Sequence, residues 1–380
     1  MIFPVNLLLR PKGGLDSELI EVVNQCAKSN WFVAVSNQNK PNWFTESGVK
    51  AVFCNALGYS GKARESGAFI AKIIAENEKT LSLQKSQVVI LGYGDRDVPM
   101  FAHSKSVLIR CDWRTDVGEK MARYGYGIAC KQVRELPKVL GLLNEEHPWY
   151  FTQQDEAFDT YCLINAATRS GSDEEHKRIA QQVQNCLKSD NDYRKQEFIT
   201  ALASSCYATP AFADSDLWAY YPSSSSANDG SELMVPFVEL GRTTFKCRKK
   251  AVPLFIRHKA TSSRHSGPQE GREDPRSQIE SIHIHPEYRG EIDGKTVVVM
   301  DDFMNYGTSF CVSAAFLRKA GAKKVLAVAF GKFPRSFTLQ EIEILTSPYS
   351  PVTKFKVTKR VPQHGTFAPE ASEAFKRKFA

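Results

Sequence analysis

The sequence predicts an α/β protein with two doubly wound, Rossmann-like parallel-sheet domains and a helical connecting segment between them. Short apolar runs alternate with stretches of helical periodicity in both halves of the chain, which is typical of strand–helix–strand units. Several runs lack polar alternation, as expected of strands that are buried on both faces of a sheet. Acidic or glycine-containing turns follow two of these runs, at the carboxyl ends of strands, where open α/β sheets bind ligands.

Composition restricts the class of protein. The chain has 380 residues, of which 42% are apolar and 24% charged, so two or three globular domains are expected. The net charge of +8 suits anionic ligands such as phosphates, and it leaves nucleic acid open as a partner without supporting it. Nine scattered cysteines without a C-x-x-C pair favour reduced thiols over disulfides or zinc. No apolar run reaches membrane-spanning length, so we expect a cytoplasmic protein without a membrane partner, of open oligomeric state.

The first α/β domain is expected over residues 1–147. Short β-branched runs predict its strands, and apolar residues at helical spacing predict its helices. In chain order, the expected elements are a strand at 2–9, a helix at 17–27, a strand at 31–35, a helix at 63–77 and strands at 87–91 and 106–110.

The segment Gly92–Met100 gives this domain a family resemblance. It reads Gly-x-Gly-Asp-x-Asp-Val-Pro-Met and resembles the fourth motif of the haloacid-dehalogenase-like (HAD-like) phosphohydrolases. The resemblance implies that Asp95 and Asp97 hold a magnesium ion. Ser36 ends a strand as the second, phosphate-binding motif of that family does, and Lys62 stands where the lysine of the third motif would be expected.

The first motif of the HAD-like family is missing. The family places a nucleophilic aspartate after the first strand, but Asn6 stands there, and the next carboxylate is Asp16. An amide can neither attack phosphorus nor supply the charge that magnesium needs. We therefore expect a degenerate relative without hydrolytic activity. The simpler alternative is that Asp95 and Asp97 cap a helix.

The remainder of the chain is expected to form a helical connecting segment over 148–212 and a second α/β domain over 213–380. Nothing in the connecting segment indicates chemistry. The expected elements of both are helices at 177–187 and 193–206, a strand at 217–221, a helix at 232–245, a strand at 251–256, a loop at 261–278, a strand ending at Met300, a helix at 311–320 and a strand at 324–330.

Two adjacent carboxylates follow the buried strand of the second domain. The run Thr296–Met300 leads into Asp301 and Asp302, then two apolar residues and a polar turn that contains Gly307. Carboxylates can accept hydrogen bonds from a sugar diol, and a loop that leads into a helix N-terminus can hold a phosphate. This stretch resembles the phosphoribosyl-pyrophosphate (PRPP) motif of type I phosphoribosyltransferases, especially the competence-protein-like branch.

The resemblance implies a role for each residue of the motif. Asp301 and Asp302 would be the catalytic pair on the ribose hydroxyls, and a magnesium ion would accompany PRPP. The residues expected around the ribose phosphate are Asn305, Tyr306, Gly307, Thr308 and Ser309. The residues expected at the pyrophosphate are Arg257 and Lys259, with Arg264, Arg272 or Arg276 closing over it from the loop.

Some residues depart from the family pattern or have simpler interpretations. The family has two threonines where this chain has Asn305 and Tyr306, which changes the expected contacts of the phosphate. The aspartate pair could instead cap a strand end, and Arg257 with Lys259 could form a solvated turn. His283 and His285 could chelate a metal, but no third ligand is evident.

Three functions remain open at this level. The first is a phosphoribosyltransferase that moves ribose 5-phosphate from PRPP to a nitrogen acceptor, in specialised nucleotide metabolism, stress response or phage defence. The second is a non-catalytic protein that binds PRPP or a nucleotide and acts in regulation or assembly. The third is a phosphatase of the HAD type that uses Asp95 and Asp97.

Overall fold

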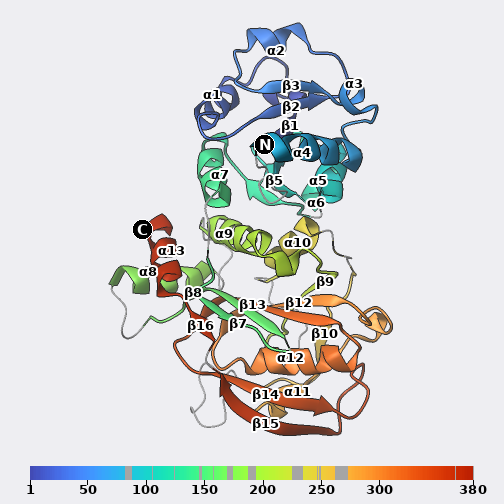
Figure 1. Cartoon of the computed structure of the whole chain (residues 1–380), viewed down its shortest axis with the longest axis vertical. Coiled ribbons are helices and arrows are strands. Elements are labelled where there is room, and N and C mark those ends of the chain that lie inside the picture. The colour runs from blue at the N-terminus through green and yellow to red at the C-terminus, as the bar shows by residue number, and fades with distance from the viewer. Residues whose placement is uncertain are drawn as a thin grey trace. The chain divides into compact units, whose positions relative to one another are not determined.

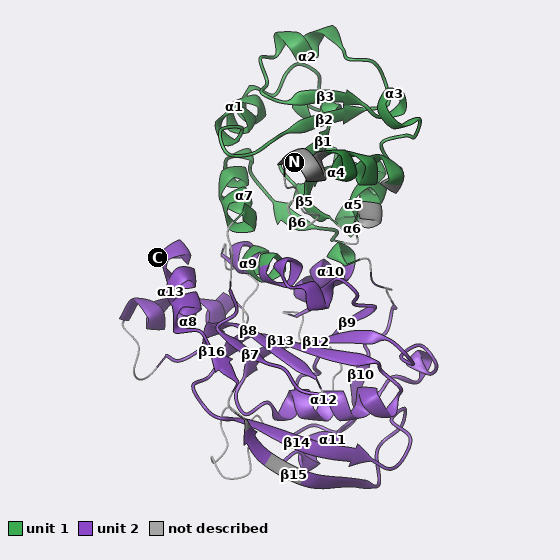
Figure 2. Ribbon diagram, viewed as in Figure 1, with its two compact units in different colours: residues 1–145, 199–204, 243–246 green, residues 146–198, 205–242, 247–380 purple. Residues whose placement is uncertain are grey.

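The structure is a computed structural model that divides into two compact units (Figure 2). The first unit comprises residues 1–145, 199–204 and 243–246, and the second comprises 146–198, 205–242 and 247–380. The described residues are 1–81, 88–104, 106–123, 125–144, 148–156, 158–168, 174–186, 194–224, 234–245, 247, 250–261, 273–363 and 365–379.

The first unit contains a six-stranded parallel sheet in the order β3-β2-β1-β4-β5-β6. The order reverses between β1 and β4, which is the arrangement of a doubly wound sheet and confirms the predicted fold class. The strands are β1 (Ile2–Pro4), β2 (Val33–Ser36), β3 (Val52–Asn55), β4 (Val89–Gly92), β5 (Val107–Cys111) and β6 (Ile128–Cys130).

Helices flank this sheet. In Figure 1, α1 (Ser17–Cys26) and α7 (Leu136–Asn144) lie together beside the sheet, while α4 (Gly67–Leu81) and α5 (Val98–Ser104) pack together apart from them. Helix α1 starts where Asp16 accepts a hydrogen bond from the Leu19 N–H at 3.1 Å. The shorter helices are α2 (Asn42–Glu46), α3 (Ala56–Ser60) and α6 (Glu119–Arg123).

The first strand is shorter than predicted. It ends at Pro4, and the chain continues as a 3-10 helix, η1 (Val5–Leu8). Proline has no N–H to donate to a neighbouring strand, and β1 has strands on both sides, so the ladder stops there. Val5, Leu7 and Leu8 are buried from within this helical turn, which accounts for the misassigned strand.

The second unit has a mixed sheet in the order β16-β7-β8-β13-β12-β9. The four strands β8, β13, β12 and β9 pair in parallel. At the other edge β7 pairs antiparallel with β8, and β16 pairs antiparallel with β7, so the prediction of a purely parallel second sheet is wrong at this edge. The strands are β7 (Phe151–Gln153), β8 (Asp159–Asn165), β9 (Leu217–Tyr220), β12 (Thr296–Met304), β13 (Lys324–Lys332) and β16 (Thr366–Phe367).

The segment 148–212 is not only helical, which corrects the prediction. It supplies α8 (Glu174–Cys186) and α9 (Lys195–Ala208), but it also supplies β7 and β8, and β8 pairs with β13 inside the sheet. All but the last residue of β8 are buried. A short apolar run with a polar residue at each end does not distinguish a strand from a buried helix, and this explains the error.

The central strands of the second unit lie under α12 (Thr308–Lys319). Nine of its residues are buried, and Val297 and Val299 share the core beneath it. The hairpin of β14 (Phe337–Ile344) and β15 (Phe355–Gln363) packs against this helix. The remaining elements are α10 (Val235–Thr244), β10 (Phe255–Arg257), α11 (Arg276–Ile279), β11 (Ile282–Ile284) and α13 (Pro369–Phe379).

Candidate functional site

Both predicted carboxylates, Asp301 and Asp302, lie in the C-terminal half of strand β12. It was expected to end at Met300, but it continues to Met304 because its pairing with β13 persists through Met304 and Lys332. Pairing with β9 stops earlier, at Met300 and Tyr220. Asp301 and Asp302 therefore extend beyond the end of β9, at the carboxyl end of the parallel strands, where ligands of open α/β sheets bind.

The two carboxylates are partly buried and interact with each other. Asp301 accepts a hydrogen bond from the Asp302 N–H at 3.0 Å, and Asp302 accepts one from the Phe303 N–H at 2.7 Å. Burial raises the pKa of Asp301 well above its usual value, and the charge of Asp302 raises it further, although a hydrogen bond with Ser309 opposes this. Within the described residues, neither carboxylate pairs with a lysine or arginine.

The turn after β12 presents polar groups without partners. Gly307 has a φ of 84°, and a side chain there would overlap the Phe337 ring, so only glycine fits. The Asn305 Oδ1 and Thr308 Oγ1 atoms are buried without a hydrogen-bond partner. The N–H groups from Thr308 to Phe310 open α12 and meet no acceptor among the described residues. A turn of this kind can accept a hydrogen-bonding, anionic group.

The side chain of Lys332 supports the turn, and Lys332 was not among the predicted site residues. Its side chain is fully buried, and its Nζ donates to the carbonyl oxygens of Asn305 at 2.8 Å, Phe333 at 2.7 Å and Arg335 at 2.5 Å. Burial lowers the pKa of Lys332 to about 8. The strand was predicted to end at Phe330, but β13 continues to Lys332, which the register pairs with Met304.

Arg335 reaches the same turn from its other side. Its Nη1 donates to the Tyr306 hydroxyl oxygen at 2.8 Å, and the guanidinium lies 5.6 Å from the centre of that ring. The Tyr306 carbonyl oxygen in turn accepts from the Thr338 N–H at 3.0 Å. Tyr306, which departs from the family pattern, is therefore held against the start of β14.

Arg257 is placed differently from the prediction. The side chain is 1% exposed, and its guanidinium donates to Ser281 at 2.6 Å, to Gln278 at 3.0 Å and to the Pro222 and Ser223 carbonyl oxygens. A guanidinium with these acceptors fixes the chain after β9 and is not available to grip a pyrophosphate. Its burial at the end of β10 was not evident from the basic run that it begins.

The other predicted pyrophosphate contacts lie apart or outside the described residues. Lys259 is exposed. Arg276 is exposed and pairs with Asp274 at 3.1 Å. Arg264 and Arg272, the other predicted loop contacts, lie outside the residues that the structure describes.

His283, which with His285 could have chelated a metal, contacts a third histidine. It is buried, and its Nδ1 lies 3.0 Å from the Nδ1 of His258. Burial lowers the pKa of His283 to about 4, with a further lowering by His258 and His285. The described residues include no group of three or more His, Cys, Asp or Glu side chains that could hold a metal ion.

A groove of about 750 Å³ follows α12 beyond the turn, between this helix and β14. Its walls carry four carboxylates and two cations, with Ala314 and Ile342 among the apolar residues. The charged residues are Asp155, Glu156, Glu341, Glu343, Arg318 and Lys319. This excess of negative charge favours a neutral or cationic group over a phosphate.

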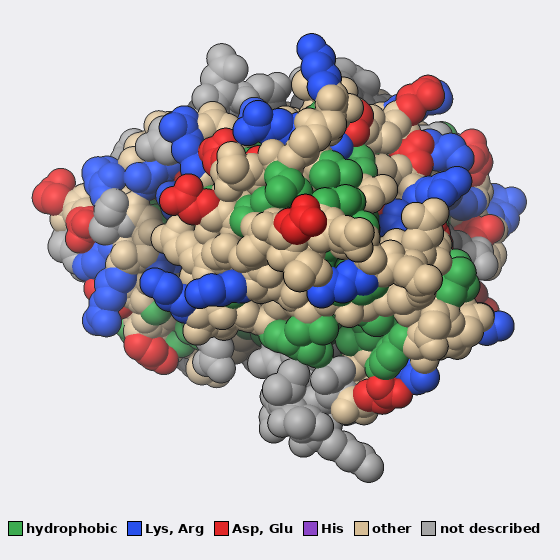
Figure 3. All heavy atoms as spheres, turned by 90° about the horizontal axis from the view of Figure 1, so that it is seen from above, with side chains coloured by type: hydrophobic (Ala, Val, Ile, Leu, Met, Phe, Trp, Pro, Cys, Tyr) green, Lys and Arg blue, Asp and Glu red, His purple; other side chains and the backbone are tan. Residues whose placement is uncertain are grey.

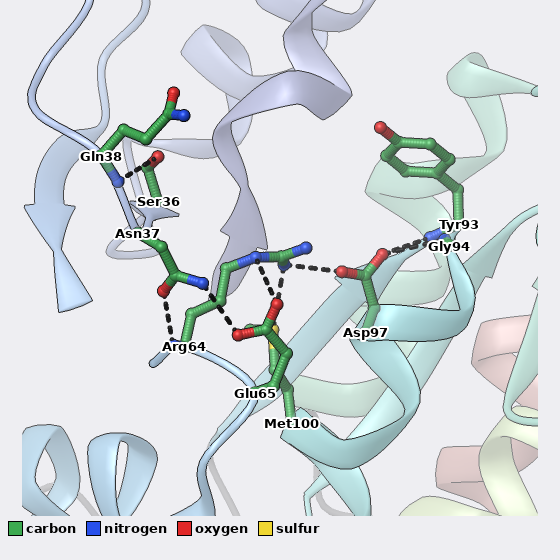
Figure 4. A network of polar contacts seen from close by, with 9 residues as sticks. All are labelled: Ser36, Asn37, Gln38, Arg64, Glu65, Tyr93, Gly94, Asp97 and Met100. Atoms are coloured by element: carbon green, nitrogen blue, oxygen red, sulfur yellow. Dashed lines mark hydrogen bonds and ion pairs between the residues drawn. The ribbon is translucent and has the colours of Figure 1, made fainter. Parts of the chain in front are cut away.

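Asp97, one of the two acids of the predicted HAD-like motif, has partners within the first unit (Figure 4). Asp97 is 1% exposed, and its Oδ1 lies 2.6 Å from Arg64 Nη1. Its other oxygen accepts from the N–H groups of Tyr93 at 3.0 Å and Gly94 at 2.9 Å. A guanidinium thus occupies the place that a magnesium ion would need beside Asp97, and this arrangement does not fit the predicted metal site.

Asp95 caps a helix. Its Oδ1 accepts from the Met121 N–H at 3.0 Å, in the first turn of α6, and Gly118 packs against the same carboxylate. Asn6 lies in η1 after β1 with an exposed side chain. Neither residue completes a metal or nucleophile site with Asp97, which favours the capping interpretation.

Arg64, rather than Lys62, is the basic residue that reaches this site. Lys62 is exposed, whereas Arg64 is held by a hydrogen bond from its N–H to Asn37 at 2.7 Å. Asn37 also donates to Glu65 at 2.9 Å, as Figure 4 shows. The network connects the carboxyl ends of β2 and β4.

Comparisons with known proteins identify no relative: no family model matches the sequence, and neither a curated protein nor a solved structure matches it. Within the described residues, no helix is both long and apolar enough to cross a membrane. On the face drawn in Figure 3, Lys and Arg side chains are interspersed with Asp and Glu, and this face gives a nucleic-acid partner no support.

Proposed function

We propose that the second unit binds PRPP and transfers its ribose 5-phosphate to a nitrogen acceptor with release of pyrophosphate. The observation that carries this proposal is that β12 leads from Asp301 and Asp302 through one turn into the N-terminus of α12, where the Thr308 Oγ1 is buried without a partner among the described residues. Acceptors for a diol and donors for a phosphate are thereby adjacent. Their separation along the chain matches the PRPP motif that the sequence resembles.

The polar groups divide between the two ends of the ribose phosphate. Asp301 and Asp302 accept hydrogen bonds from the vicinal hydroxyls, each charged contact contributing about 1.5–3 kcal/mol. The N–H groups at the start of α12 and the Thr308 hydroxyl, which lacks a partner in the described structure, donate to the phosphate. The ligand therefore satisfies groups that would otherwise be buried without hydrogen bonds.

The chemistry is a displacement at C1 of the ribose. The C1–O bond to pyrophosphate breaks, the leaving group takes the electron pair, a C1–N bond forms, and the acceptor nitrogen loses a proton. The magnesium ion enters with the pyrophosphate as part of the substrate. The carboxylates stabilise the positive charge that develops on the ribose, because they are negative and partly shielded from water.

A non-catalytic role in regulation or assembly is the second candidate, and one observation favours it. The guanidinium of Arg257, the residue expected to hold pyrophosphate, is used within the fold. A protein that binds ribose phosphate without a grip on the leaving group would act as a sensor. The phosphatase alternative has less support, since Arg64 neutralises Asp97 in the first unit.

Release of pyrophosphate separates the two candidates. Purified protein with PRPP and magnesium is incubated with nucleobases, amines and nucleic acids, and pyrophosphate is measured with a coupled assay. Release that depends on one acceptor and disappears in Asp301→Asn supports the transferase. Binding of PRPP without release from any acceptor would favour the sensor instead.

A further inference from the structure

Lys332 and Arg335 bring two basic side chains to the turn after β12, and neither forms an ion pair with a carboxylate among the described residues. Lys332 ends β13 and Arg335 follows it, and the Lys332 amine donates to three carbonyl oxygens. In the described part of the chain neither side chain forms an ion pair, and the groups that influence the Lys332 amine are Cys162 and Arg335. A buried cation is costly without an anion nearby, so this arrangement favours an anionic ligand.

Tyr306 has an unused hydrogen-bond donor beside Arg335. The hydroxyl oxygen accepts from the guanidinium at 2.8 Å, and arginine cannot accept a hydrogen bond in return. The hydroxyl is half-exposed, and its proton is available to an acceptor outside the described residues, because none lies among them. Arg335 is itself partly exposed and uses one of its five N–H groups in this contact.

We propose that Arg335 and Tyr306 together bind the phosphoryl group of the ligand, with Lys332 as a positioning residue that holds the turn. This inference rests on the proposed function and adds residues to its phosphate site. It also gives the Asn305-Tyr306 departure a physical reason. Tyrosine is long enough to hold an arginine over the turn, so a guanidinium and a phenol replace the contacts expected from threonine hydroxyls.

The test measures affinity for ribose 5-phosphate by calorimetry, with PRPP and magnesium as a second ligand. Loss of a charged contact to phosphate predicts a reduction of about tenfold or more for Arg335→Gln, and a smaller one for Arg335→Lys. The matched control is Arg318→Gln, an exposed arginine on α12, which should leave the affinity unchanged.

A double-mutant cycle shows whether Tyr306 and Arg335 contact the ligand or only stabilise the turn. Tyr306→Phe keeps the ring and removes the hydroxyl, and it should weaken the binding of ribose 5-phosphate several-fold. In the combined variant the affinity should stay near that of Arg335→Gln, because the two groups act on one phosphate. Thermal unfolding of each variant shows whether it is folded, and Tyr306→Phe with Arg335→Lys provides the same cycle if Arg335→Gln does not fold.

The outcomes separate the two proposals. If the unaltered protein binds neither ribose 5-phosphate nor PRPP, the proposed function is wrong. If it binds both and the folded Arg335 variants bind equally well, only the present inference is overturned. Strictly additive effects of the Tyr306 and Arg335 substitutions would likewise contradict a shared phosphate contact.

Discussion

Asp301 holds its proton more strongly than an exposed aspartate, because it is buried and lies beside Asp302. Its pKa in the folded protein is above the ordinary value of 3.8, so the folded state binds more protons than the unfolded state. Protonation of Asp301 therefore stabilises the folded protein fully below pH 3.8. This contribution is lost as pH rises through the raised pKa. The cost at neutral pH is typical of a residue kept for binding rather than stability.

Asp301→Asn should therefore raise the thermal midpoint at neutral pH by a few degrees and abolish ligand binding. The amide removes the buried charge and keeps the shape of the side chain. Calorimetric unfolding of both proteins between pH 4 and 8 measures the effect, and the difference in midpoint should grow as pH rises. A midpoint that is lower in the variant across this range would contradict this account of the aspartate pair.

Lys332 stabilises the folded protein at neutral pH, unlike Asp301, because its amine donates hydrogen bonds to three carbonyl oxygens. Lys332→Met keeps the length of the side chain but leaves those buried acceptors without a donor. We expect the free energy of unfolding to fall by about 3 kcal/mol. Urea denaturation followed by fluorescence measures this, and Lys323→Met, at an exposed position, is the control. Equal stability of the two variants would show that the amine does not support the turn.

At the scale of the element, the turn between β12 and α12 depends on one glycine. Gly307 combines a φ of 84° with close contact to the Phe337 ring. Gly294 has a similar φ of 68° but no atom within 4 Å of the place where a Cβ would stand. Comparing substitutions at Gly294 and Gly307 therefore separates the loss of stability due to the backbone conformation from the loss due to the contact with Phe337.

Gly294→Ala should cost about 1 kcal/mol, the price of a left-handed backbone for alanine. Gly307→Ala should cost at least about twice as much, because the methyl group must also displace the phenyl ring. It should also weaken PRPP binding, since the N–H groups of α12 would shift. Chemical denaturation and calorimetry of both variants provide the comparison, and equal losses of stability would show that the turn can relax.

The elements also show how far sequence reasoning extends. The apolar run before Asp301, the turn at Gly307 and the helix behind it were predicted, because each has a local signal in spacing or residue type. The contacts of Arg257 and the role of Lys332 were not, since both depend on segments distant in sequence. The antiparallel edge of the second sheet was missed for the same reason: β16 follows β7 by more than 200 residues.

At the scale of the whole molecule, the two units have different chemical character. Around Asp97 in the first unit, the described polar groups already have partners within the fold, whereas the turn after β12 in the second unit has donors and acceptors without partners. The motif that resembles the HAD-like family predicted two acids, Asp95 and Asp97, at a strand end. It could not show that Arg64 forms an ion pair with Asp97. We therefore expect a structural role for the Arg64–Asp97 pair, and ligand binding in the second unit.

Arg64→Met should consequently destabilise the first unit and leave ligand binding unchanged. Removing one member of a buried ion pair costs about 3–5 kcal/mol, because the other charge is left without a partner. Hydrogen exchange of the amides in β4 measures the loss of stability, and calorimetry with PRPP measures the binding. A variant as stable as the unaltered protein would show that the pair has no structural role.

The central claim is that Asp301 and Asp302 bind the ribose of PRPP. The direct measurement is a calorimetric titration of the whole protein with PRPP and magnesium, repeated on the Asp301→Asn/Asp302→Asn variant. The control is Glu343→Gln, which removes an exposed carboxylate of β14 in the same unit. We expect saturable binding by the unaltered protein and by the control, and none by the double variant. Absence of binding by the unaltered protein, or equal binding by the double variant, would contradict the claim.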